Sequence, residues 1–195
     1  MGIAVAARGV PPKTASFQAN EDVKVFDENN SEVEPGSGNM GMVATPSAMR
    51  GYYKDPEKTD KTVRMIDGVR WVFPGDYAII ESDGSMTLLG RGSNCINTAG
   101  EKVFPEEVEE AVKSHEEVID CLVVGVADEK FGEKVVALVS TSGKAGSEAD
   151  LIDYCRKKIA GYKLPKHIIL VKEVKRAPNG KADYKWAKDQ ALHAL

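Results

Sequence analysis

Short apolar runs separated by turn-forming residues dominate the first half of the chain. These runs are rich in β-branched and aromatic residues, which is typical of strands. They cover residues 23–26, 42–45, 69–73, 76–80 and 86–89. Ser82-Asp83-Gly84-Ser85 predicts a hairpin turn between the last two runs, and Asp55-Pro56 predicts the start of a short helix. The pattern indicates a small antiparallel sheet or part of a distorted barrel.

The first twenty residues lack such a pattern. They are small, polar and rich in turn formers, and Val10-Pro11-Pro12 is too rigid for the interior of a helix or strand. We interpret it as part of a segment cut from a longer chain.

The second half alternates extended and helical patterns. Helices are expected from Pro105, from a Ser147 cap to a closing Gly161, and from Ala182 onward. The expected strands cover residues 96–98, 102–104, 118–126, 134–141 and 167–174. This alternation over about 100 residues predicts a compact domain with its own core. The predicted fold class is α+β, in which a small antiparallel β subdomain precedes a compact α+β domain.

Composition places the chain among folded proteins. Of its 195 residues, 42% are hydrophobic and 29% are charged, so global disorder is not expected. No apolar run approaches the roughly 20 residues that span a bilayer, and the N-terminus lacks the pattern of a signal peptide. Cys95, Cys121 and Cys155 have no metal-ligand spacing, and we expect reduced thiols, with the last two on apolar faces. These features predict a cytoplasmic protein.

The charge distribution is asymmetric. Residues 105–133 hold ten acidic and two basic residues, a local net charge of −8. Residues 156–188 hold eleven basic and two acidic residues, a local net charge of +9. The basic stretch could serve a phosphorylated cofactor or nucleic acid, pack beside the acidic stretch, or form a solvated face. Nucleic acid is the weakest of these interpretations, because aromatic residues are few and no nucleic-acid motif occurs.

One glycine-rich stretch has the spacing of a dinucleotide-binding motif. It is Gly36-Ser37-Gly38-Asn39-Met40-Gly41. A strand pattern follows it, whereas the dinucleotide motif opens a helix. A turn between two strands is therefore the favoured interpretation.

Three positions could carry chemistry. Asp76 follows a Pro-Gly pair at a strand start, where it could accept bonds from ribose hydroxyls or from nearby backbone. Arg91 lies between two glycines, where it could mark a hinge or form a surface ion pair. Lys181 follows a Pro-Asn-Gly turn, so a loop tip presents it to a phosphate, to a developing charge or only to solvent.

Several blocks match a known family in both order and spacing. They are residues 51–59, Gly75-Asp76, Asp83-Gly84, Gly90-Arg91, Gly100-Glu101, Pro105-Glu106-Glu107-Val108-Glu109 and Asn179-Gly180-Lys181. Together they resemble the C-terminal third of the acyl-adenylate-forming enzymes, which include acyl-CoA synthetases, aryl-CoA ligases, luciferases and nonribosomal adenylation domains. The stretches GRGSNCINTAGEKVFPEEVE and NGKADYKWAK are most similar to bacterial long-chain fatty-acid and steroid CoA ligases.

The resemblance implies a two-step ligase. A carboxylate attacks ATP to give an acyl-adenylate and pyrophosphate, and the CoA thiol then displaces AMP. By position, Asp76 would hold the ribose hydroxyls, and Arg91 would contact the same ribose or phosphate region. Lys181 would bridge the carboxylate and the α-phosphate during adenylation. Ser93 would be the hinge residue, although the family usually has Asp or Lys there, and Gly100 would line the pantetheine tunnel.

The resemblance also implies a division of the chain. Residues 1–90 would be the last, incomplete subdomain of the large AMP-binding domain, residues 91–93 the hinge, and residues 94–195 the mobile lid domain. ATP or AMP, CoA and Mg²⁺ would serve the complete enzyme, whose phosphate loop and Mg²⁺ ligands precede the matched region. A fatty-acid-like carboxylate would be the substrate, which is compatible with peripheral membrane association, and the oligomeric state is not indicated.

One expectation and two alternatives follow for the polypeptide itself. These 195 residues alone should lack ligase activity, because the phosphate loop and most of the acyl pocket lie in the preceding region of the family. One alternative is a non-catalytic module that binds CoA or a protein partner. Another is a lid domain with a regulatory use, in which Lys181 is an acylation target.

Overall fold

The computed structural model describes residues 4–5, 16–143 and 147–195. The chain folds into two compact units, Met1–Ser93 and Asn94–Leu195. The predicted irregular segment Val10-Pro11-Pro12 lies outside the described residues.

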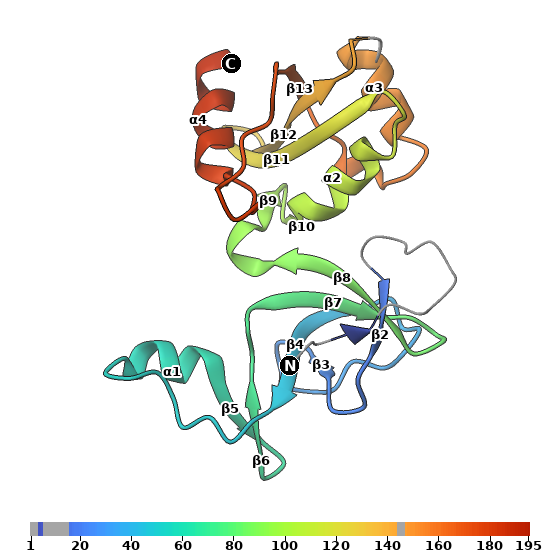
Figure 1. Cartoon of the computed structure of the whole chain (residues 1–195). Helices are drawn as coiled ribbons and strands as arrows, with labels where there is room; N and C mark the ends of the chain where they lie inside the picture. Colours follow the sequence, from blue (N-terminus) through green and yellow to red (C-terminus); the bar gives the residue numbers. More distant parts are fainter. Residues whose placement is uncertain (1–3, 6–15, 144–146) are drawn as a thin grey trace. The chain divides into compact units, whose positions relative to one another are not determined.

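The first unit is built on an antiparallel sheet. Its strand order is β1-β2-β8-β7-β4-β6-β5, and β3 pairs with β4 (Figure 1). The strands are β1 (Ala4–Val5), β2 (Ser16–Ala19), β3 (Lys24–Phe26), β4 (Met40–Pro46), β5 (Val63–Ile66), β6 (Val69–Val72), β7 (Asp76–Ile80) and β8 (Ser85–Arg91). Within the described part of the chain the order ends in β1 and β5, so the sheet is open and does not close into a barrel.

Three of these strands were not predicted. The sequence pattern indicated no strand in residues 1–20, but where the structure describes them β1 pairs with β2 and β2 pairs with β8. β5 pairs with β6 across Asp67 and Gly68, whose φ angles of 50° and 75° suit a tight hairpin turn. This Asp-Gly pair was a usable hairpin signal in the sequence.

The other local predictions for the first unit are confirmed. Helix α1 (Pro56–Thr62) begins where expected, with the Asp55 side chain accepting a 2.9 Å hydrogen bond from the Lys58 N–H. The glycine-rich stretch at residues 36–41 turns with positive φ at Gly36 and Gly38 and leads into strand β4. It therefore lacks the helix that a dinucleotide motif requires.

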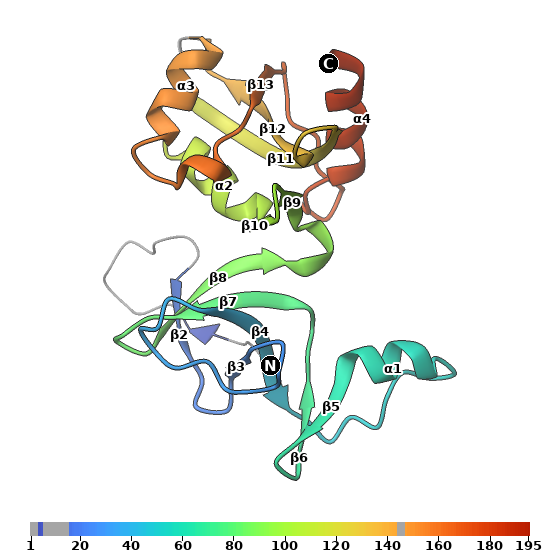
Figure 2. The same cartoon turned by 180° about the vertical axis from the view of Figure 1, so that it is seen from behind.

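The second unit packs helices on both faces of a five-stranded sheet of order β10-β9-β12-β11, with β13 parallel to β12 (Figures 1 and 2). Its strands are β9 (Ile96–Thr98), β10 (Glu101–Val103), β11 (Val118–Asp128), β12 (Gly132–Thr141) and β13 (His167–Leu170). Successive β11 side chains point to opposite faces. Cys121 and Val123 join the core that includes α2 (Pro105–Lys113) and α3 (Glu148–Cys155). Leu122 and Val124 join the core under α4 (Tyr184–Ala194).

Two boundaries in this unit differ from the prediction. Ser147 caps α3 as expected, and Asp150 completes a capping box, but the helix ends at Cys155. The chain then turns, with the Lys158 and Ile159 N–H groups donating to the Cys155 carbonyl, and Gly161 opens the short 3₁₀ turn η2 (Gly161–Lys163). The strand predicted over residues 167–174 ends at Leu170, where its parallel pairing with β12 ends.

Cys121 and Cys155 are buried free thiols, as predicted, and burial raises the pKa of both. In the part of the chain that the structure describes, no helix is long and apolar enough to cross a membrane.

Candidate functional site

Asp76 and Arg91 lie opposite one another at the ends of two neighbouring strands. Asp76 begins β7, Arg91 ends β8, and the two residues are register partners. The Arg91 Nε–H donates to Asp76 Oδ1 over 3.2 Å. The Asp76 side chain is 22% exposed, whereas that of Arg91 is 63% exposed. An ionised carboxylate has about four acceptor positions, so Asp76 can still accept bonds from a ligand hydroxyl.

The two glycines beside Arg91 are needed for different reasons, Gly90 for its backbone conformation and Gly92 for close packing. Gly90 has a φ of 132°, which disfavours other residues. A Cβ on Gly92 would lie 2.7 Å from Tyr77 Cε2, so Gly92 is needed for close approach. Its N–H also donates to the Gly75 carbonyl over 3.0 Å. Ser93 is exposed in the short 3₁₀ turn η1 (Gly92–Asn94), where the first unit ends.

Gly100 lies at the tip of the β9–β10 hairpin. Ala99 and Gly100 have φ angles of 52° and 85°, as a tight two-residue turn requires. Apart from Gly100 and its two chain neighbours, no heavy atom of the described residues lies within 4 Å of the position that a Gly100 Cβ would take. The base of the turn is tied to the sheet, because the Ala99 N–H donates to the Phe131 carbonyl over 2.8 Å. The turn therefore presents open space beside Gly100.

Lys181 is exposed on a loop whose backbone is closed by local hydrogen bonds. The Ala177 N–H donates to the Lys181 carbonyl and the Gly180 N–H to the Ala177 carbonyl, each over 2.8 Å. The Lys181 N–H donates to Asn179 Oδ1 over 3.1 Å. The predicted loop presentation of this lysine is confirmed.

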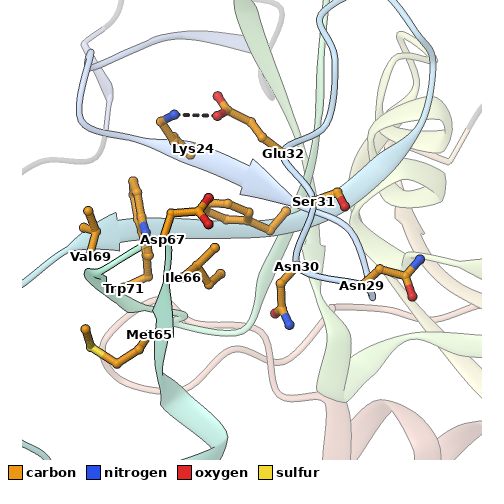
Figure 3. A pocket seen from close by; sticks show the side chains of 11 residues that line it. Lys24, Asn29, Asn30, Ser31, Glu32, Met65, Ile66, Asp67, Val69 and Trp71 are labelled. Atoms are coloured by element: carbon orange, nitrogen blue, oxygen red, sulfur yellow. Dashed lines mark hydrogen bonds and ion pairs between the residues drawn. The ribbon is translucent and has the colours of Figure 1, made fainter.

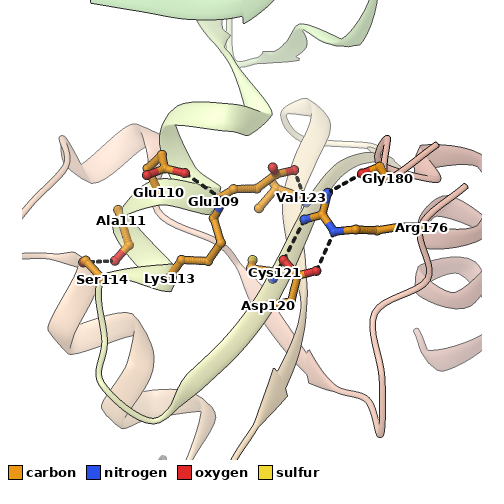
Figure 4. Close-up of polar contacts among 10 residues, drawn as sticks. All are labelled: Glu109, Glu110, Ala111, Lys113, Ser114, Asp120, Cys121, Val123, Arg176 and Gly180. Atoms are coloured by element: carbon orange, nitrogen blue, oxygen red, sulfur yellow. Dashed lines mark hydrogen bonds and ion pairs between the residues drawn. The ribbon is translucent and has the colours of Figure 1, made fainter. Parts of the chain in front are cut away.

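Next to this loop lies a cluster that we did not identify as a site from the sequence (Figure 4). The Arg176 guanidinium donates to both Asp120 carboxylate oxygens over 2.7 Å. Glu109 is only 5% exposed and accepts a 3.0 Å bond from the Val123 N–H. The sequence did contain a signal for the burial of Glu109. It follows Pro105 by four residues and Val108 by one, which places it on the apolar face of α2.

The environment of these groups changes their proton affinities. Burial raises the pKa of Glu109 to about 7, despite the hydrogen bond from Val123. Burial also raises the pKa of the Tyr184 hydroxyl, and the nearby Glu109 carboxylate raises it further. At Asp120, burial alone would raise the pKa, but bonds from Arg176 and the Cys121 N–H outweigh it and lower that pKa.

Among the described residues, two ion pairs join the acidic stretch to the basic stretch. One is Asp120 with Arg176, and the other is Glu107, whose two carboxylate oxygens accept bonds from Lys163 Nζ over 2.7 Å. The basic stretch therefore packs beside the acidic stretch through these two ion pairs.

A hollow of about 580 Å³ lies in the first unit, and none of the predicted site residues lines it (Figure 3). It opens between β3 with its following loop and the β5–β6 hairpin, and Trp71 and the Lys24–Glu32 ion pair line it. Within residues 4–5, 16–143 and 147–195, no group of three or more His, Cys, Asp or Glu side chains could hold a metal ion.

Comparison with known proteins identifies the chain's relatives. Residues 107–181 match the AMP-binding enzyme C-terminal domain. The chain is 50% identical to 3-oxocholest-4-en-26-oate–CoA ligase of Rhodococcus rhodochrous over 97% of its length and 35% of that protein. It is 52% identical to the medium/long-chain-fatty-acid–CoA/3-oxocholest-4-en-26-oate–CoA ligase of Mycobacterium tuberculosis over 85% of its length and 31% of that protein. The chain thus spans about a third of the length of the curated relatives it matches.

Solved structures agree with these relatives. ATP-bound MatB from Rhodopseudomonas palustris gives a TM-score of 0.75 at 29% identity, covering 89% of this chain and 35% of that one. A fatty acyl-CoA synthetase of Mycobacterium tuberculosis gives a TM-score of 0.63 at 28% identity, covering 93% of this chain and 36% of that one. The predicted α+β class is confirmed. The chain belongs to the AMP-binding, acyl-adenylate-forming enzymes and corresponds to their C-terminal portion.

Proposed function

We propose that the chain is the C-terminal part of an ATP-dependent acyl-CoA ligase that acts on a fatty-acid-like or steroid side-chain carboxylate. The observation that carries this proposal is the 50% identity over 97% of the chain to a steroid-acid CoA ligase. The fatty-acid and steroid-acid CoA ligase at 52% identity supports the same class of substrate. Because ATP and CoA are the proposed co-substrates, a cytoplasmic location is part of the proposal.

The first proposed step is adenylation. The substrate carboxylate attacks the α-phosphorus of ATP, and pyrophosphate leaves with the electron pair of the broken P–O bond. Asp76 is assigned to the ribose hydroxyls and Arg91 to the same ribose or phosphate region, supported by their pairing at the ends of β7 and β8. Lys181 is assigned to the charge that develops between the carboxylate and the α-phosphate. Its exposure on a closed turn is compatible with that role.

The second proposed step is thioester formation. The CoA thiol attacks the acyl carbon, loses its proton, and AMP leaves. Residues 1–90, 91–93 and 94–195 are proposed as the last part of the large domain, the hinge and the lid. The end of the first unit at Ser93 supports a hinge there. Gly100 is assigned to the pantetheine path, supported by the open space beside its α-carbon.

Mg²⁺ would supply charge neutralisation at the phosphates in the complete enzyme. The described residues provide no cluster for it. We therefore assign no residue of this chain to the metal.

A direct assay tests the proposal for the polypeptide itself. The 195-residue chain is incubated with ATP, CoA and a panel of fatty and steroid acids, and AMP release is measured against a Lys181→Ala control. We expect no release above the control, because these residues hold only part of each proposed site. Release that depends on Lys181 would show that the chain alone is a complete ligase.

The basic stretch favours a second candidate function, a non-catalytic module that binds CoA or a protein partner. Several of its lysines are exposed on α4 and on the segment before it, and the stretch has a net charge of +9. Titration of the chain with CoA tests this candidate. Tight binding that is lost when Lys172, Lys175 and Lys185 are changed to Gln would favour the module.

A further inference from the structure

The position of Lys181 is set by the backbone of its loop and not by contacts of its side chain. In the described part of the chain, no hydrogen bond or ion pair is recorded for its side-chain ammonium group, and the residue is exposed. The turn bonds among residues 177–181 fix the shape of the loop but do not attach it to the sheet. Attachment must come from the residues on either side of the loop.

The first attachment is on the N-terminal side of the loop. Arg176 reaches Asp120 of β11 through two parallel N–H···O bonds of 2.7 Å, from Nε and Nη2. Its Nη1 also donates to the Gly180 carbonyl over 3.4 Å, so the same guanidinium contacts the loop itself (Figure 4). Paired bonds of this kind fix orientation as well as distance.

The second attachment is on the C-terminal side of the loop. Tyr184 begins α4, three residues after Lys181, and packs against the core that includes Leu122 and Val124 of β11. Its hydroxyl lies close enough to the buried Glu109 carboxylate of α2 for each group to shift the pKa of the other. Glu109 in turn accepts the Val123 N–H over 3.0 Å. In the described sheet β11 is an edge strand, so no neighbouring strand accepts a hydrogen bond from the Val123 N–H. The Glu109 carboxylate accepts it instead.

We infer that Asp120 and Glu109 are positioning residues that hold the two sides of the Lys181 loop against the edge strand β11. The attachments are made by side chains from β11 and α2, far from Lys181 in sequence, and both act through the edge of one strand. Their role in catalysis rests on the proposed function, whereas their effect on the loop does not.

Hydrogen exchange on the 195-residue chain tests the inference. Asp120→Asn removes the charge of the first attachment while keeping its shape, and Tyr184→Phe removes only the hydroxyl of the second. We expect each to speed exchange of the Gly180 and Lys181 amides about tenfold, because each removes a partly buried polar contact beside the loop. Exchange in the central strand β12 should not change.

Matched variants separate positioning from general destabilisation. Asp153→Asn removes the exposed Arg156–Asp153 pair of α3 and should leave the loop amides unchanged. Arg176→Gln should act like Asp120→Asn, and the double variant should act like either single variant, since both remove one interaction. Unchanged loop exchange, an effect in only one of Asp120→Asn and Tyr184→Phe, or acceleration shared with β12 would overturn the inference.

A kinetic readout keeps the two proposals distinguishable. In a complete ligase that carries this chain, Asp120→Asn should slow acyl-adenylate formation and leave KM for ATP unchanged, since a positioning residue does not touch the nucleotide. A changed KM with an unchanged rate would overturn the positioning role. If Lys181→Ala does not slow adenylation there, the proposed function fails while the exchange result stands.

Discussion

Arg91 Nε donates to Asp76 Oδ1 over 3.2 Å, although fifteen residues separate the two in sequence. The β7–β8 hairpin makes them register partners, so one cation and one carboxylate are presented together where the strands end. Both side chains keep contact with solvent. The pair can therefore serve a ligand, and its contribution to stability is expected to be small because exposed ion pairs are screened by water.

Asp76→Asn should separate these two roles. The free energy of unfolding of the chain should change by less than about 1 kcal/mol, as for other exposed ion pairs. In a complete ligase, KM for ATP should rise about tenfold to a hundredfold, because hydrogen bonds to an ionised acceptor are lost. Chemical denaturation and ATP-dependent kinetics give the two values. Asp60→Asn changes an exposed aspartate of α1 and should alter neither, so equal effects of both variants would contradict the ribose role.

Lys181→Ala should abolish adenylation without unfolding the protein. The side chain is exposed, so the melting temperature should not change. The rate of acyl-adenylate formation in a complete ligase should fall about 10²- to 10³-fold, which is typical for loss of one group that stabilises transition-state charge. Pyrophosphate release in a single turnover is the measurement. Lys185→Ala alters an exposed lysine in the first turn of α4 and should retain the full rate.

Gly100→Ala should affect the second step more than the first. Its φ of 85° strains any other residue, and we expect a loss of about 1–2 kcal/mol in the free energy of unfolding. A methyl group would enter the open space assigned to pantetheine, so thioester formation should slow while adenylation continues. Gly84→Ala is a matched control in the β7–β8 turn, with a φ of 80° and similar open space. It should cause similar strain and leave thioester formation intact.

Glu109 should make stability depend on pH. Between its ordinary pKa of 4.5 and its raised pKa of about 7, the folded protein holds a proton that the unfolded chain releases. The free energy of unfolding should therefore fall as pH rises through this window, by up to about 3 kcal/mol for this group. Glu106 and Lys113 of α2, with Tyr184 and Arg176, are the neighbouring groups that act on it.

Glu109→Gln should remove most of this slope in urea unfolding curves recorded from pH 5 to pH 8. Asp120 does not mimic the effect, because its lowered pKa contributes stability that is lost only below this window. Glu57→Gln, at a side chain 80% exposed, should keep the wild-type slope. An unchanged slope in Glu109→Gln would contradict the prediction.

Features that depend on near neighbours were predictable from the sequence. The Asp55 and Ser147 caps formed as expected, because a helix start needs only the side chains within its first turn. The apolar run within β11 is buried on both faces, and the period of two assigns its residues to the two cores. The family blocks around Asp76, Arg91, Gly100 and Lys181 were also identified from order and spacing alone.

Features that depend on distant partners were decided by the tertiary structure. β2 forms against β8 although its own residues carry little strand signal, because pairing with a strand some seventy residues away supplies its hydrogen bonds. Asp120 and Arg176 are 56 residues apart, and only the fold brings them to one edge of the sheet. Glu109 is an ordinary acidic residue in the sequence, and burial against β11 raises its pKa. Sequence thus determined the local elements and the residues of the proposed site, whereas long-range packing decided what holds the Lys181 loop.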